Sequence, residues 1–382
     1  MNLNVVFLAC TQGYGYAFSA CNTKVEFMAK GLTELGNICY IHNGTIGRNG
    51  IAAPEYRNIY GIGTVVDYPI KGRWYISPIR NNELLINDLK KWRRDDMLNW
   101  VIVEAPYLPY YYLEVSAARK AGYKVAVISH EWLGTFQNSN PIRRWINHCY
   151  ANVFGYCVDA ILPISEYIIE KIQKFKKPYL KVPVEADFSK ESSYTKKKPF
   201  FLYCVSAEYL RVIRMILDGF KEFLPSNPKY KMILVLAGGK HAIDATCDTV
   251  KEMGLSNDIE IKHNIPYNEL IHLYETASGL IVPLDPNFEQ DEARFSQKIA
   301  EYLSSGSPII SNNVGEVKHY FTDRQNIILN EFSSDGFCNS FRWIAENTEE
   351  SVKIGRAGYA LGRRYFDYRV CGKQLHEFLN NN

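Results

Sequence analysis

Short runs of β-branched and aromatic residues alternate along the chain with segments whose apolar residues recur every three or four positions. This alternation is typical of βαβ units on parallel sheets. In the first half we expect strands at 4–9, 38–42, 100–103, 123–131 and 159–165, with helices at 23–37, after 104 and at 166–174. Gly36 closes the first of these helices.

A polar stretch at 181–200, which contains Pro183, Pro199 and the run Lys196-Lys197-Lys198, predicts a linker. The alternation then restarts, with strands expected at 199–205, 231–239, 259–261, 278–284 and 308–311, and helices at 211–224, 244–253, 267–276 and over most of 349–380. We therefore expect two Rossmann-like αβα domains in tandem. Ligands of open parallel sheets bind beyond the carboxyl ends of the strands, so two such domains would face each other across a cleft.

The composition favours an ordinary globular protein of two domains. The chain has 382 residues, of which 47% are hydrophobic and 22% charged, and its net charge of +3 argues against a nucleic-acid-binding protein. Basic residues interleave with aromatics at 90–94, 143–145 and 171–177. These clusters are either solvated helix ends or contacts with an anionic membrane surface, and the sequence leaves both readings open.

Nine cysteines, an odd number without a CxxC pair, predict reduced thiols in a cytoplasmic protein. Some lie in apolar runs, as Cys10, Cys204 and Cys371 do. The apolar run at the N-terminus is too short for a signal peptide, and no segment approaches the roughly 20 apolar residues of a membrane span. No D-x-D follows a strand, so we expect neither a metal nor a cofactor.

Three groups in the first half follow predicted strands. Gly13-Tyr14-Gly15 is either a tight turn or a flexible wall of an acceptor site. His130, followed by Glu131, is placed to donate a hydrogen bond to a sugar hydroxyl or a reacting oxygen, unless a neighbouring carbonyl satisfies it. Glu104 has a similar position after its strand.

Two groups in the second half are placed in the same way. Arg211 opens a helix shortly after a strand, where a guanidinium suits a diphosphate; the alternative is a solvated charge. Gly238-Gly239 offers bare backbone at a strand end, or is a plain turn.

The stretch 291–316 is the most informative part of the sequence. An acid-rich loop leads through Arg294 to a short helix that carries Glu301, and the positive end of that helix suits a diphosphate near Ser296 to Lys298. We place Glu301 on nearly the same face as Arg294, at a depth where it reaches the two hydroxyls of a nucleotide ribose. The alternative is an exposed helical acid.

These residues carry a family resemblance. The segment "RFSQKIAEYLSSGSPIISNNVGEVKHY" resembles the donor site of the retaining glycosyltransferases with the GT-B fold, through Phe295, Glu301, Gly306, Pro308 and Gly315-Glu316. The segments "FFLYCVSAEYLRVIRMILDGFKEF", "ILVLAGG" and "IPYNELIHLYETASGLIVPL" are also similar to that family. The likeness is strong over 160–375 and limited to the general pattern before that.

The resemblance implies a role for each candidate. Glu301 binds the ribose, backbone amides near Phe295 to Lys298 and the Arg211 side chain hold the diphosphate, and the loop of Asn264 and Ile265 faces the base. His130 lies near the transferred sugar. The residues implied on the donor side are Ser206, Arg211, Gly238, Gly239, Asn264, Ile265, Arg294, Phe295, Ser296, Gln297, Lys298 and Glu301.

Two positions depart from the family. Its first acid falls on Ala293, where Asp291 or Glu292 would substitute only by a shift of the loop, and its glycine-arginine pair falls on Val205-Ser206. Loss of one such cation costs about 1.5–3 kcal/mol in binding.

The resemblance implies an α/β GT-B protein. We expect an acceptor domain at 1–182, a donor domain at 196–362 and a helix at 363–382 that returns to the first domain. The expected function is metal-independent, retaining transfer of a sugar from a nucleotide-diphosphate sugar, with a UDP-sugar as the best guess, to a glycan or lipid-linked acceptor at the inner face of a membrane. The alternatives are a nucleotide-sugar epimerase of this architecture and a non-catalytic partner subunit that binds nucleotide sugars.

Overall fold

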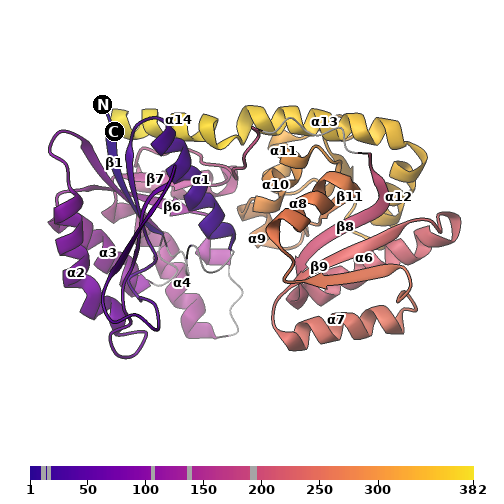
Figure 1. The fold of residues 1–382 in the computed structure, drawn as a ribbon, viewed down its shortest axis with the longest axis horizontal. Coiled ribbons are helices and arrows are strands. Elements are labelled where there is room, and N and C mark those ends of the chain that lie inside the picture. Colours follow the sequence, from indigo (N-terminus) through magenta and orange to yellow (C-terminus); the bar gives the residue numbers. More distant parts are fainter. Residues whose placement is uncertain (10–13, 15–18, 105–107, 136–139, 190–195) are drawn as a thin grey trace. The chain divides into compact units, whose positions relative to one another are not determined.

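The computed structural model describes residues 1–9, 14, 19–104, 108–135, 140–189 and 196–382. The chain divides into two compact units. Unit 1 comprises Met1–Glu185, Ala293–Gln297 and Phe366–Asn382, and unit 2 comprises Ala186–Glu292 and Lys298–Tyr365. Figure 1 shows the first half of the chain and the last helix in one unit and the remainder in the other.

Unit 1 is built on a seven-stranded sheet in the order β3-β4-β2-β1-β5-β6-β7. All pairs are parallel except β3 with β4. The strands are β1 (Leu3–Ala9), β2 (Ile38–His42), β3 (Glu55–Ile59), β4 (Gly63–Asp67), β5 (Leu98–Glu104), β6 (Lys124–Ser129) and β7 (Ala160–Pro163). The helices are α1 (Ala20–Glu34), α2 (Ser77–Trp92), α3 (Leu108–Lys120), α4 (Pro141–Val153), α5 (Glu166–Ile172) and α14 (Tyr368–Asn381).

Unit 2 has a wholly parallel six-stranded sheet in the order β10-β9-β8-β11-β12-β13. Its strands are β8 (Lys198–Ser206), β9 (Lys231–Ala237), β10 (Ile259–His263), β11 (Ala277–Val282), β12 (Ile309–Asn312) and β13 (Ile328–Asn330). The helices that follow in the chain are α6 (Leu210–Phe223), α7 (Lys240–Glu252), α8 (Tyr267–Thr276), α9 (Glu289–Ala293), α10 (Gln297–Ser305), α11 (Val317–Tyr320), α12 (Ser334–Glu346) and α13 (Thr348–Tyr365).

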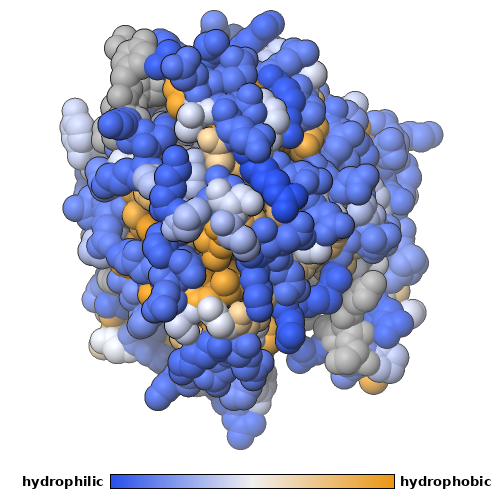
Figure 2. All heavy atoms as spheres, turned by 90° about the vertical axis from the view of Figure 1, so that its right-hand side faces the viewer, coloured by the Kyte–Doolittle hydropathy of each residue, from blue (hydrophilic) through white to orange (hydrophobic). Residues whose placement is uncertain are grey.

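Successive side chains of the central strands point to opposite faces of the sheet, so every second residue packs on the same side. In β1, Leu3, Val5 and Phe7 pack with apolar residues of α1 and α14. In β8, Phe201 and Tyr203 pack with α6 and α12. Polar residues cover most of the face that Figure 2 presents, and apolar side chains appear as small areas between them. None of the described helices is both long and apolar enough to cross a bilayer.

The last helix belongs to unit 1, where it lies along α1 (Figure 1). The two helices cross at Gly31 and Gly372, and a Cβ on Gly31 would stand 2.5 Å from the carbonyl oxygen of Tyr368. Trp100 Nε1 donates to the carbonyl of Leu379 at 3.1 Å. Glycine at the crossing therefore lets α14 close over the sheet that begins the chain.

The predicted elements are present, but several boundaries are wrong. Helix α1 begins at Ala20 rather than 23, because the Ser19 hydroxyl accepts from the Asn22 amide at 3.1 Å and caps the helix there. Helix α7 begins at Lys240 rather than 244. The sequence analysis did not predict the strands β3, β4 and β13 or the helices α2, α4, α9, α11 and α12.

The predicted linker is not a solvated tether over its described residues. Val182, Val184, Glu185 and Phe188 are buried. Tyr359 Oη donates to the carbonyl of Phe188 at 2.8 Å, within unit 2. Residues 190–195 lie outside the described part of the chain.

Candidate functional site

Helix α10 carries Glu301 as a buried acid. Only 8% of Glu301 is exposed, and its neighbours Ala300 and Tyr302 are fully buried. Tyr302 meets Tyr274 of α8 edge to face, with ring centroids 4.8 Å apart. The reading of Glu301 as an exposed helical acid is therefore wrong.

Burial controls the protonation of Glu301. Removal from water raises the pKa of this carboxyl to about 7, although the charge of Lys298 and a hydrogen bond from Tyr274 act in the opposite direction. A carboxylate held in this way gains from any ligand that donates hydrogen bonds to it, because those bonds replace the water that it has lost.

The start of α10 is fixed by contacts within unit 1. Gln297 Nε2 donates to the carbonyl of Glu185 at 2.5 Å, and Ser165 Oγ donates to the carbonyl of Ala293 at 2.6 Å. The buried ring of Phe295 meets Phe366 edge to face at 5.5 Å. These contacts involve side chains and backbone carbonyl oxygens. None of them uses a backbone amide of the first turn of α10.

Arg294 precedes α10, and this corrects the predicted geometry. The helix begins at Gln297, and residues 294–296 belong to no helix, so Arg294 and Glu301 do not share a helical face. Ser296 and Lys298 flank the helix start as expected, and both are half-buried.

The expected acid-rich loop is instead the short helix α9, and a Cβ on Gly315 would stand 2.5 Å from the carbonyl oxygen of Asp291. Asp291 Oδ2 accepts from the amide of Asp285 at 2.8 Å, and Glu292 pairs with Lys318 at 2.8 Å. Ala293 is fully buried. Both acids that could replace the family's missing carboxylate are thus engaged within unit 2.

Arg211 stands at the start of α6 and pairs with an acid that the sequence analysis missed. Its Nη2 lies 2.7 Å from Oδ2 of Asp285, and its side chain is 77% exposed against 12% for Asp285. Asp285 comes three residues after β11, which is the signal that could have identified it. One carboxylate therefore orients a guanidinium whose other donors face solvent.

The ends of β8 and β9 lie together in unit 2. A Cβ on Gly238 would stand 3.7 Å from the amide nitrogen of Ala207 and 3.8 Å from Oγ of Ser206. The φ of Gly238 is +128°, which glycine alone adopts readily. Gly239 is the N-cap of α7 and makes no side-chain capping bond, and a Cβ there would meet no atom of the described residues within 4 Å.

Asn264 follows β10 in a left-handed conformation, with φ +52°, and is exposed, whereas Ile265 is half-buried. Asparagine tolerates this region better than most residues do. The assignment of this loop to a nucleotide base stays a prediction.

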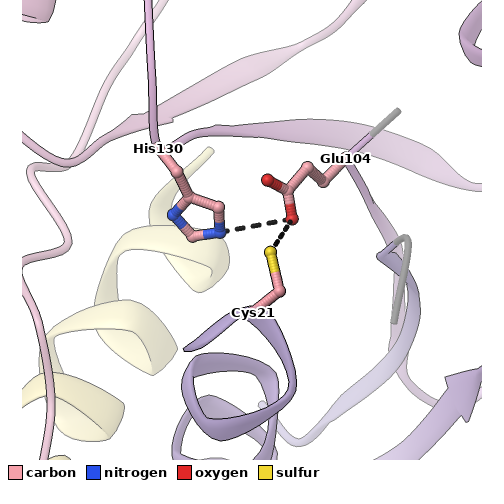
Figure 3. Close-up of side chains that lie close together, drawn as sticks. All are labelled: Cys21, Glu104 and His130. Atoms are coloured by element: carbon pink, nitrogen blue, oxygen red, sulfur yellow. Dashed lines mark hydrogen bonds and ion pairs between the residues drawn. The ribbon is translucent and has the colours of Figure 1, made fainter. Parts of the chain in front are cut away.

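Three polar side chains of different chemistry converge in unit 1 (Figure 3). Glu104 ends β5, His130 follows β6 and Cys21 lies in the first turn of α1. Oε2 of Glu104 is 3.3 Å from Nε2 of His130 and 3.3 Å from Sγ of Cys21. His130 thus faces a carboxylate, and its Nε2 has no hydrogen-bond partner among the described residues.

The surroundings shift the pKa values of Glu104 and Cys21 in opposite directions. Burial tends to raise the pKa of Glu104, but His130, Cys21 and Lys24 together hold it below its ordinary value. Burial and then the charge of Glu104 raise the pKa of the Cys21 thiol. Glu104 is therefore a carboxylate beside a protonated thiol.

A second buried pair lies next to this cluster. Lys24, one turn after Cys21, donates to the carbonyl of Val182 at 2.8 Å, and burial lowers its pKa to about 8. Burial raises the pKa of Glu185 to about 8, and neither carboxylate oxygen has a hydrogen-bond partner among the described residues. The sequence analysis did not identify this pair, because both residues lie beside apolar residues in the sequence.

The remaining candidates of unit 1 have separate positions. The amide of Tyr14 donates to Oδ1 of Asn43 at 2.8 Å, and its carbonyl accepts from Arg57 at 3.2 Å, so this buried residue is held against the sheet. Gly13 and Gly15 lie outside the described residues. Glu131 is exposed.

Comparisons with known proteins agree with this architecture. None of the curated proteins compared with the chain matches it in sequence. Sucrose-phosphate synthase from Thermosynechococcus elongatus has 11% identity and a TM-score of 0.76, over 99% of this chain and 98% of that one. Anabaena HepE, solved in complex with UDP-glucose, has 12% identity and a TM-score of 0.72, over 99% and 100%.

A UDP-forming α,α-trehalose-phosphate synthase from Burkholderia vietnamiensis is also similar, with 11% identity and a TM-score of 0.70 over the whole of both chains. The chain therefore has the fold of the GT-B glycosyltransferases. Residues 185–361, which make up most of unit 2, match the family described as glycosyl transferases group 1.

The burial of Glu301 predicts a pH-dependent stability. Its pKa is about 7 in the folded chain against an ordinary 4.5, so the folded state binds more protons between these values. The stabilisation present below pH 4.5 is lost as the pH rises through 7. In Glu301→Gln, which keeps the neutral form, we expect less loss of unfolding free energy between pH 5 and pH 8 than in the wild type. Denaturant titrations across this range measure the difference, and parallel curves for the two proteins would contradict the assignment.

Proposed function

We propose that this protein is a retaining glycosyltransferase that moves a hexose from a nucleotide-diphosphate sugar, with UDP the preferred nucleotide, to a glycan or lipid-linked glycan acceptor. The observation that carries the proposal is the burial of Glu301 in the second turn of α10, within the segment that matches glycosyl transferases group 1. The similar HepE structure was solved with UDP-glucose.

The geometry of α10 suits a nucleotide. Glu301 stands four residues after the helix start at Gln297, which corresponds to about 6 Å along the axis. The amides of the first turn have no partners within the helix and carry its positive end. A diphosphate at that end would bring the adjoining ribose level with Glu301, whose two oxygens accept one hydrogen bond from each ribose hydroxyl.

In this proposal, side chains of the protein supply the positive charge that stabilises the leaving diphosphate. Arg211 is oriented by Asp285 and keeps donors exposed, and Lys298 stands in the first turn of α10. Preorganised charges of this kind stabilise the negative charge that develops on the leaving phosphate. The transfer then needs no divalent cation at the diphosphate. Retention follows if the acceptor attacks from the face that the diphosphate leaves.

The exposed side chains of helix α4 favour the proposal of a membrane-bound acceptor. Its first six residues are all exposed, including Ile142 at 66% and Trp145 at 67%, with Arg143 and Arg144 between them. Apolar and aromatic side chains beside basic ones are the composition of helices that lie in the interface of an anionic bilayer. We propose that α4 docks the protein on the cytoplasmic face of such a membrane, where a lipid-linked acceptor would be reached.

Loss of the Glu301 carboxylate should weaken nucleotide binding. For Glu301→Ala we expect the affinity for UDP and UDP-sugars to fall at least tenfold, or about 1.4 kcal/mol, because two hydrogen bonds to the ribose are removed. Isothermal titration calorimetry measures the change. Glu252→Ala, which removes an exposed acid of α7 in the same unit, is the control and should bind as the wild type does. Unchanged binding by Glu301→Ala would remove this residue from the site.

A thermal-shift panel of nucleotide diphosphates and their sugars selects the donor for that titration. Product analysis then separates transfer from its alternatives. Conversion of the sugar with donor alone would indicate an epimerase, and binding without release of the diphosphate for any acceptor would indicate a non-catalytic subunit.

The membrane assignment predicts salt-sensitive binding through α4. We expect the protein to float with vesicles that contain anionic phospholipid, less so in high salt, and not with zwitterionic vesicles. Trp145→Ala should reduce flotation severalfold. Trp74→Ala, which removes another exposed tryptophan of unit 1, should leave it unchanged. Equal loss in both variants, or no flotation of the wild type, would rule out this role for α4.

A further inference from the structure

Cys21, Glu104 and His130 form a set of side chains that hydrogen bonding alone explains poorly. Nε2 of His130 is buried and lies 3.3 Å from the Glu104 carboxylate, yet it makes no hydrogen bond of good geometry to any described residue. One ligand atom from each of the three residues lies within 4.8 Å of the ligand atoms of the other two. Both the imidazole and the thiol approach the same oxygen, Oε2.

We propose that these three side chains bind a zinc-class transition-metal ion, with one coordination position left open. Tetrahedral zinc has bonds of about 2.3 Å to sulfur and about 2.0–2.2 Å to nitrogen and oxygen, so its ligand atoms stand roughly 3.3–3.6 Å apart. Two of the three separations in this cluster are already 3.3 Å. The third separation, between Sγ and the imidazole nitrogen, is at most 4.8 Å.

The donor set selects the metal. A thiolate, an imidazole and a carboxylate together suit zinc and its neighbours in the first transition series, whereas magnesium and calcium take oxygen ligands. Three protein ligands and a free position are the arrangement of zinc sites that also hold water or substrate. The cluster lies where β5 and β6 end, which is where sheets of this kind receive their ligands.

The charges at the site also balance. Zinc bound to the Cys21 thiolate and the Glu104 carboxylate makes a neutral group, so the ion adds no net charge to a half-buried position. The nearby Lys24 faces Glu185, and its ammonium is already held by the Val182 carbonyl. The three ligands come from α1, β5 and the residue after β6, so the sheet and one helix fix their spacing.

This inference does not rest on the proposed transfer reaction. The metal independence proposed above concerns the diphosphate, whereas the zinc site consists of side chains of unit 1 alone. A failure to bind zinc would leave the nucleotide proposal standing, and a failure to bind nucleotide would leave the zinc proposal standing.

The test is a titration of the metal-free full chain with Zn²⁺ in competition with a chromophoric chelator. We expect one ion per chain, with affinity reduced at least tenfold in Cys21→Ala and in Glu104→Gln. Cys157→Ala removes another half-buried thiol of unit 1, which hydrogen-bonds to a backbone carbonyl at 3.2 Å, and should bind as the wild type does. Equal binding by wild type and Cys21→Ala would overturn the site.

Cobalt supplies a readout that does not depend on the stability of a variant. Co²⁺ added to the wild-type chain should give the near-ultraviolet absorption of a sulfur-to-cobalt bond, together with the visible bands of a tetrahedral ion. Cys21→Ser, which keeps the size of the side chain, should lose the sulfur band. A wild-type spectrum that shows only octahedral, oxygen-ligated cobalt would contradict the proposal.

Discussion

Parallel pairing of the strands is the constraint that gathers the chemistry of this molecule. In a parallel sheet all strands run in the same direction, so their carboxyl ends lie along one edge of the sheet. Glu104 and His130 lie at the carboxyl ends of neighbouring strands of unit 1, and Ser206 and Gly238 lie at those of neighbouring strands of unit 2. The helices cover both faces and leave this edge as the place where polar side chains and bare backbone can meet a ligand.

Burying an ionisable group costs free energy of hydration, and the fold alone gives no reason to place such groups at buried positions. Glu301 is raised to a pKa of about 7, and the buried pair of Lys24 and Glu185 is shifted in opposite directions to about 8 each. Apolar residues of similar size would pack at these positions without the loss of hydration. Strongly shifted groups near strand and helix ends are common at functional sites, and they lie here in or beside the segments that we propose to bind nucleotide and metal.

Much of the fold could be predicted from the sequence, because parallel strands buried on both faces are continuous apolar runs such as those of β8 and β11. The hairpin of β3 and β4 escaped prediction, since β3 is largely exposed and shows no apolar run. The position of Glu301 was predictable because apolar residues surround it in a short helix. The partner of Arg211 was not, because Asp285 is 74 residues away along the chain. Cys21 was missed for the same reason, since only the sheet brings it to Glu104.

The central claim is that α10 binds a nucleotide through the positive end of the helix and the buried carboxylate of Glu301. A crystal structure of the chain with UDP tests it most directly. The account predicts the diphosphate within hydrogen-bond distance of the amides of Ser296 to Lys298, and both ribose hydroxyls donating to Glu301. Nucleotide density away from α10, or a ribose that leaves Glu301 without a partner, would contradict it.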